Sequence, residues 1–101
     1  MINLSVVILT KNEEKNIRDC LESVAGWADE IVVVDDESTD KTVDIAREYT
    51  DKIITRKMDI EGRHRNFAYS QAKSGWVLSL DADERVTEGL RLEIKEAIAH
   101  H

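Results

Sequence analysis

The sequence predicts an α/β protein with a mostly parallel sheet of about four strands and helices on both faces. Short apolar runs rich in Val, Ile and Leu recur along the chain, and segments with helical spacing separate them. Near-continuous apolar runs are typical of strands that a parallel sheet buries on both faces. Regular alternation of strands with helices implies right-handed crossover connections.

Four apolar runs are expected to form the strands, because each is short and closed by polar residues. Their order along the chain gives the pattern β-α-β-α-β-α-β-α. The runs span residues 2–9, 31–34, 52–55 and 76–80, of which the third is the weakest.

Helical periodicity fills the segments after each strand. Apolar residues recur at i, i+3, i+4, i+7 and i+8 over residues 17–25, and similar spacing marks 64–72 and 90–98. The segment 39–49 has a less regular pattern but still places small and apolar residues on one side. Each segment therefore predicts a helix with one face toward a core.

Capping residues mark the expected helix boundaries. Asn12 precedes two glutamates, Ser38 precedes Thr-Asp, and Thr87 precedes a glutamate, so each is expected to cap a helix N-terminus. Gly75 follows the third helical pattern, where a left-handed C-terminal cap is expected.

Length and composition bound the possible functions. The 101 residues suit one domain, without a linker or repeat. Net charge is −7, with 14 basic against 21 acidic residues and no long basic run, which argues against a general nucleic-acid binder. No membrane span or signal peptide is expected. The single cysteine, Cys20, excludes an internal disulfide and fits a reducing compartment.

Polar side chains follow the predicted strands. In open α/β sheets, ligands bind beyond the carboxyl ends of the strands. Carboxylates or amides are gathered in three of these four ends, at residues 10–13, 35–38 and 81–84. Such acidic groups repel a nucleotide diphosphate, so an anionic ligand here implies a divalent cation.

Asp81 and Asp83 are the candidate metal ligands. They directly follow a strand, and a period of two places both carboxylates on one side. Hard oxygen ligands suit Mg²⁺ or Mn²⁺ when substrate phosphates complete the shell. The alternative is that both are solvated loop aspartates that prepare the turn into the next helix.

The other strand ends offer candidate nucleotide contacts with equally open alternatives. Asp35 and Asp36 could accept hydrogen bonds from a ribose or base, or could favour a helix N-terminus. Thr10, Asn12 and Glu13 could read a nucleobase, although helix capping explains part of that pattern.

Two arginines open the third helical segment on either side of a histidine. Arg63 and Arg65 could pair with phosphates or with the acidic cluster, or could be ordinary exposed helix residues. His64 between them is interpreted as a packed histidine rather than a ligand. The sequence contains no glycine-rich phosphate loop.

Three stretches together resemble family 2 glycosyltransferases of the GT-A fold, in particular the branch of bacterial lipopolysaccharide core glucosyltransferases. The stretches are LSVVILTKNEEKNIRDCLESV, ADEIVVVDDESTDKTVDIA and RNFAYSQAKSGWVLSLDADERV. The resemblance covers about residues 3–90 and rests on several motifs in the correct order. It implies a Rossmann-like nucleotide-binding half.

The resemblance also implies roles for individual residues. Those matching Thr10, Asn12 and Glu13 line the nucleotide pocket, and the acidic pair matching Asp35 and Asp36 binds the uracil or ribose side. By the same resemblance, Arg65 is expected near the base and diphosphate, and Asp81 is associated with ribose and metal. Asp83 is the better candidate for direct contact with Mn²⁺ or Mg²⁺.

The implied activity is inverting transfer of a sugar from a nucleotide-sugar donor, expected to be UDP-linked. The acceptor would be a saccharide or lipid-linked molecule in cell-envelope or lipopolysaccharide synthesis. The enzyme is expected in the cytoplasm. The full-length protein is further expected to associate peripherally with the inner face of the membrane.

Family members are much longer than this chain and carry their general base in the second half. Residues 1–101 are therefore expected to be the N-terminal, nucleotide-binding part of a truncated enzyme, able to bind nucleotide but not to transfer sugar. The alternative is a non-enzymatic α/β module such as a receiver domain, although receivers place an acidic pair where this chain has Thr-Lys-Asn.

Overall fold

The computed structural model describes residues 3–100, except for the side chain of Glu61. Strands and helices alternate as the sequence predicts, and they form one four-stranded sheet in which every paired strand is parallel. The predicted start of the first strand at Ile2 lies outside the described residues. The elements are β1 (Leu4–Thr10), α1 (Ile17–Ala25), β2 (Glu30–Asp35), α2 (Thr42–Ala46), β3 (Ile53–Thr55), α3 (Glu61–Ser70), β4 (Trp76–Asp81) and α4 (Glu88–Ala99).

The strand order is β3-β2-β1-β4, which confirms the predicted α/β class and specifies its topology. The chain winds outward from β1 to β3 and then crosses back to place β4 on the other side of β1. This is the Rossmann order, whereas receiver-like folds follow the order 2-1-3-4-5. The reversal leaves a crevice between the carboxyl ends of β1 and β4, where ligands bind in open α/β sheets.

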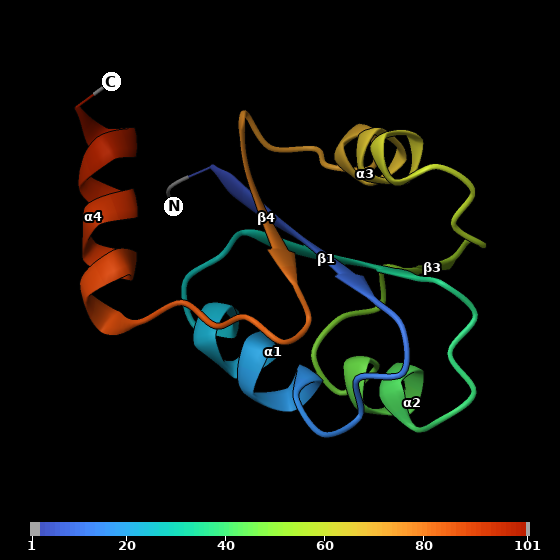
Figure 1. Cartoon of the computed structure of the whole chain (residues 1–101). Helices are drawn as coiled ribbons and strands as arrows, with labels where there is room; N and C mark the ends of the chain where they lie inside the picture. The colour runs from blue at the N-terminus through green and yellow to red at the C-terminus, as the bar shows by residue number, and fades with distance from the viewer. Residues whose placement is uncertain (1–2, 101) are drawn as a thin grey trace.

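Helices cover both faces of the sheet, as predicted. Figure 1 shows α1 and α2 below it, α3 above it, and α4 standing at the side nearest β4. Alternate residues of β1 serve two cores: Val6 and Ile8 join the cluster with α1, while Val7 and Leu9 join the cluster with Ala68 of α3. The two-sided burial explains why this strand is apolar at consecutive positions.

The expectation that all four strands are buried on both faces is wrong for β3 and β4. The seven residues of β1 are all buried, but β4 begins with two exposed residues, Trp76 and Val77. The reason is position, since β3 and β4 form the two edges of the described sheet. Cys20 is buried, as expected, and burial raises the pKa of its thiol to about 12.

Two of the three predicted N-terminal caps are wrong. Helix α1 begins at Ile17, and Asn12 has a left-handed backbone with φ 50°. Its side-chain oxygen accepts a hydrogen bond from the Thr39 amide at 2.8 Å, and the Ser38 hydroxyl accepts one from the Asn12 amide at 2.7 Å. Both residues therefore join the loops after β1 and β2. Only Thr87 caps its helix as predicted, accepting a hydrogen bond from the Leu90 amide.

The predicted left-handed cap at Gly75 is also wrong. Helix α3 ends at Ser70, and no described glycine has a positive φ. A Cβ at Gly75 would lie 2.7 Å from the amide nitrogen of the Asn3 side chain. The glycine is therefore explained by this close approach.

One carboxylate joins three segments at the amino end of the sheet. Glu30 accepts hydrogen bonds from the Ser5 hydroxyl at 2.7 Å, the Lys73 amide at 2.9 Å and the Lys52 ammonium at 3.1 Å. Partial burial by itself would raise the pKa of Glu30, but these hydrogen bonds outweigh burial and hold the pKa below its usual range.

We therefore expect Glu30 to make stability depend on pH. Because its pKa is lower in the folded state, the stabilisation is present above the ordinary glutamate pKa of about 4.3, and is lost as the pH falls through the lowered value. Urea unfolding of wild type and Glu30→Gln should give free-energy differences that shrink as the pH falls below about 4. A constant difference from pH 7 to pH 3 would contradict this role.

Within residues 3–100, no helix has both the length and the apolar character needed to cross a membrane.

Candidate functional site

A cavity of about 310 Å³ lies at the carboxyl ends of β1 and β4, where the strand order reverses. We call it the strand-end cavity. Residues from the carboxyl ends of β1 and β4, from the loops that follow all four strands, and from α3 line it. They are Leu9, Thr10, Lys11, Glu13, Asp36, Met58, His64, Arg65, Asp81, Ala82 and Asp83.

Most of the predicted site residues meet in this cavity. Asp36 follows β2 and Asp83 follows β4, yet both line the same space. The predicted residues found there are Thr10, Glu13, Asp36, Arg65, Asp81 and Asp83, whereas Asn12 and Asp35 are not among its lining residues.

Asp35 instead holds the loop that follows β2. Its side chain is almost fully buried and accepts hydrogen bonds from the Ser38 amide at 2.9 Å and the Ser38 hydroxyl at 2.6 Å. Because Ser38 in turn contacts Asn12, this chain of hydrogen bonds fixes the two loops beside the cavity. Asp35 and Asn12 therefore hold the loops beside the cavity in place and do not line the cavity themselves.

Asp36 forms a fixed acidic wall of the cavity. Its amide donates to the Thr10 carbonyl at 2.9 Å, and its Oδ1 accepts from the Met58 amide at 2.9 Å. Its Oδ2 lies 3.9 Å from the Lys11 ammonium. These contacts orient the carboxylate while leaving lone pairs on its oxygens for a ligand.

Thr10 carries a buried hydroxyl without a partner. The residue is 5% exposed, and among residues 3–100 its Oγ1 has no hydrogen-bond partner. Leaving a buried hydroxyl unpaired costs about 1–3 kcal/mol. Because this oxygen has almost no accessible surface, a ligand in the strand-end cavity reaches it only if a neighbouring side chain shifts.

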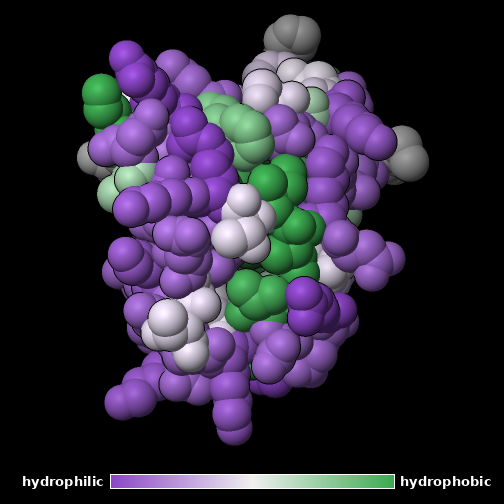
Figure 2. Space-filling view, turned by 90° about the vertical axis from the view of Figure 1, so that its right-hand side faces the viewer, coloured by the Kyte–Doolittle hydropathy of each residue, from purple (hydrophilic) through white to green (hydrophobic). Residues whose placement is uncertain are grey.

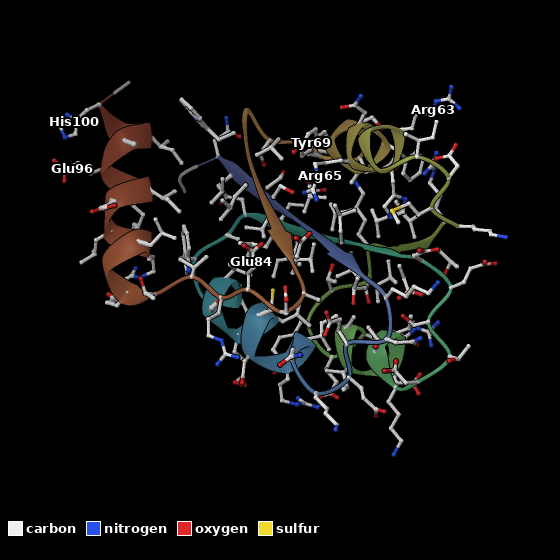
Figure 3. The ribbon with its side chains drawn as sticks, in the orientation of Figure 1. Arg63, Arg65, Tyr69, Glu84, Glu96 and His100 are labelled. Carbon is white, nitrogen blue, oxygen red and sulfur yellow. The ribbon has the colours of Figure 1, made fainter. Side chains whose placement is uncertain are left out.

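Arg65 brings a positive charge to the cavity from α3. Its guanidinium donates to the Ser79 hydroxyl at 2.9 Å and lies 3.4 Å from a carboxylate oxygen of Asp81. Figure 3 shows Arg65 directed from α3 toward the sheet, whereas Arg63 points away. The structure thus separates two arginines that the sequence placed together.

The turn after β4 presents the two candidate metal ligands. The Glu84 carboxylate accepts from the Asp81 amide at 2.7 Å, and the Glu84 amide donates to the Asp81 carbonyl at 2.9 Å, which fixes the turn. Within the described part of the chain, no three Asp, Glu, His or Cys side chains form a metal-binding group. Two carboxylates still fit Mg²⁺ or Mn²⁺, since these ions commonly take one or two carboxylates plus phosphates and waters.

The charge balance of the cavity is acidic. Four carboxylates line it, against the two cations Lys11 and Arg65. Figure 2 views the side that carries the loops after β2 and β3, and its surface is mostly hydrophilic with a narrow hydrophobic strip. A cavity of this kind suits a polar ligand, and an anionic one would be favoured by a bound cation.

Sequence reasoning missed Lys11, Met58 and His64 as lining residues. Lys11 directly follows β1, between the predicted contacts Thr10 and Asn12. Met58 lines the cavity and donates its backbone amide to Asp36, a contact that no side-chain motif predicts. His64 is buried, as its periodic position predicted, but it also lines the cavity.

Comparisons with known proteins agree with this geometry. The family model described as Glycosyl transferase family 2 matches residues 5–100. An uncharacterized glycosyltransferase of Rickettsia typhi is 41% identical over 101 residues, covering 100% of this chain and 35% of its own length. The lipopolysaccharide core biosynthesis glycosyltransferase LpsC of Rhizobium meliloti is 35% identical over 101 residues, covering 95% of this chain and 37% of its own length.

A solved structure shows the same architecture. Residues 1–349 of TarS from Staphylococcus aureus, in complex with UDP, superpose with a TM-score of 0.82 at 32% identity, covering 98% of this chain and 32% of that one. The chain thus spans about a third of the length of the relatives it matches. The fold, the strand-end cavity and the family match over nearly the whole sequence agree, and the chain belongs to glycosyl transferase family 2.

Proposed function

We propose that the strand-end cavity binds the nucleotide of a UDP-linked sugar donor. The observation that carries this proposal is the convergence of Thr10, Asp36, Arg65 and the Asp81–Asp83 turn on one cavity at the point where the strand order reverses. Nucleotides bind at such points in Rossmann-type sheets. The similarity to TarS, which was solved with UDP, supports uridine as the base.

Each lining group has a part in this proposal. Thr10, Glu13 and Asp36 contact the base and ribose, and Asn12 and Asp35 support them by fixing the adjacent loops. Arg65 offsets the charge of Asp81 and adds a donor for the base or diphosphate side. In this arrangement the hydrogen-bonding groups face the uridine, and the positive charge faces the phosphates.

Asp83 and Asp81 are the residues that would hold Mn²⁺ or Mg²⁺. Their carboxylate oxygens suit a hard cation, and the phosphates of the donor would complete its coordination. When bound, the cation supplies neutralising charge for the departing diphosphate. Lys11 and Arg65 add positive charge to the same cavity.

The proposed reaction is inverting transfer of a sugar to a saccharide or lipid-linked acceptor of the cell envelope. The similarity to LpsC, whose name specifies lipopolysaccharide core biosynthesis, supports this class of acceptor. Such transfer needs a carboxylate that takes the proton of the acceptor hydroxyl. No residue of this chain matches the general base of the family, so we expect the 101-residue chain to bind the donor without transferring sugar.

Titration of the chain with UDP in the presence of Mg²⁺ tests the binding proposal. In ¹H–¹⁵N spectra we expect saturable shifts at residues 10, 11, 13, 36, 64–65 and 81–83, because these line the cavity. Arg65→Gln should weaken binding by about tenfold, the usual worth of a hydrogen bond to a charged group.

Arg63→Gln is the matched control, since it removes the same charge from the same helix but points away from the sheet. It should bind UDP as wild type does. Absence of shifts at millimolar UDP, or shifts confined to the amino end of the sheet, would reject the proposal.

A further inference from the structure

His64 has one nitrogen committed and one available. The residue is 3% exposed and lines the strand-end cavity. Its Nδ1 lies 3.0 Å from a guanidinium nitrogen of Arg56. Its Nε2 makes no hydrogen bond to any residue in the range 3–100.

Arg56 determines which nitrogen carries the proton. A guanidinium only donates hydrogen bonds, so Nδ1 of His64 accepts, and the proton of the neutral ring lies on Nε2. Arg56 is itself held in place. It lies over the ring of Phe67 at 4.9 Å and forms an ion pair with Asp59 at 3.7 Å. His64 is therefore presented as an N–H donor and not as an acceptor.

The cavity then offers groups that complement one edge of uracil. That edge reads acceptor, donor, acceptor, as O2, N3–H and O4. The carboxylate of Asp36 only accepts and can take the N3–H, while the Nε2–H of His64 can donate to a carbonyl oxygen.

We propose that His64 is a specificity-determining residue, held by Arg56 as an Nε2–H donor to a carbonyl oxygen of the uracil base. The inference rests on the proposed binding of UDP in this cavity, and it assigns a ligand contact to a residue whose position in the sequence predicted only packing. Arg56 is a positioning residue, since it acts through His64. A donor that is fixed in this way rejects a base with an amino group at the same place, because two donors would face each other.

Two analogues of UDP that carry sulfur in place of O2 or O4 test the contact, because sulfur accepts hydrogen bonds weakly. With wild type, we expect one of the two analogues to bind about fivefold more weakly than UDP, as for the loss of one neutral hydrogen bond. His64→Phe should bind UDP about fivefold more weakly and should no longer distinguish that analogue. His64→Gln keeps an N–H donor at a similar reach and should restore much of the discrimination.

The control variant is Tyr69→Phe, an exposed change on the same helix, which should leave all affinities unchanged. If the sulfur analogue bound more weakly than UDP by the same factor in wild type and in His64→Phe, the inference would be overturned while UDP binding stayed intact. Failure of wild type to bind UDP would instead overturn the proposed function.

A spectroscopic measurement covers the case in which His64→Phe does not fold. ¹⁵N spectra of the imidazole in wild type should show the proton on Nε2 and a shift of that nitrogen when UDP is added. A proton on Nδ1, or an Nε2 signal that UDP does not move, would overturn the inference without any variant.

Discussion

Asp83→Asn is expected to abolish most of the gain in UDP affinity that Mn²⁺ or Mg²⁺ provides, a loss of about tenfold or more. The side chain lines the strand-end cavity, and an amide oxygen without charge holds a divalent cation far less well than a carboxylate. Without the cation, the diphosphate meets the acidic wall of the cavity. The measurement is the UDP dissociation constant by calorimetry, with and without the metal.

The matched control for this variant is Asp51→Asn. Asp51 is exposed and lies two residues before β3, at the opposite end of the sheet, so the control removes the same charge far from the cavity. Its dissociation constants should equal those of wild type. If Asp83→Asn kept the full gain from metal, the metal site would have to be assigned to other residues.

Asp35→Asn is expected to lower the free energy of unfolding by about 2–3 kcal/mol. The buried carboxylate accepts two hydrogen bonds from Ser38, and an asparagine would turn its NH₂ group toward one of those donors or lose the contact. Asp35 does not line the cavity, so the folded fraction should lose less UDP affinity than Asp36→Asn does. Urea unfolding and calorimetry separate the two effects.

Asp44→Asn serves as the control for stability, since Asp44 is an exposed helix residue whose ion pair with Arg47 lies on the surface. Its unfolding free energy should change by no more than about 0.5 kcal/mol. A loss of UDP affinity in Asp35→Asn without loss of stability would support the direct nucleotide contact that the sequence suggested for Asp35.

Sequence reasoning located the strands well because burial on two faces leaves a pattern that is independent of partners. The run VVIL within β1 is apolar at consecutive positions, since alternate residues serve the two cores. Helix starts were less predictable. Asn12 and Ser38 have the composition of caps, but they bond to each other's loop across 26 residues.

At the site, the adjacent aspartates also show what the sequence leaves open and the tertiary structure decides. Asp35 and Asp36 are chemically identical and consecutive, so no sequence pattern distinguishes their roles. The strand alternation turns Asp36 toward the cavity and Asp35 toward Ser38. Likewise, His64 and Arg56 are eight residues apart, and only the packing of α3 on the sheet joins them.

The sequence by itself determined the α/β class, the alternating order of elements and the gathering of acidic residues at the strand ends, because periodicity and composition are local properties. The tertiary structure decided the strand order, the pairing of β1 with β4 and hence which side chains share the cavity. Those depend on crossover connections and on packing between distant segments, and no local pattern encodes the distance between two side chains that far apart in the chain.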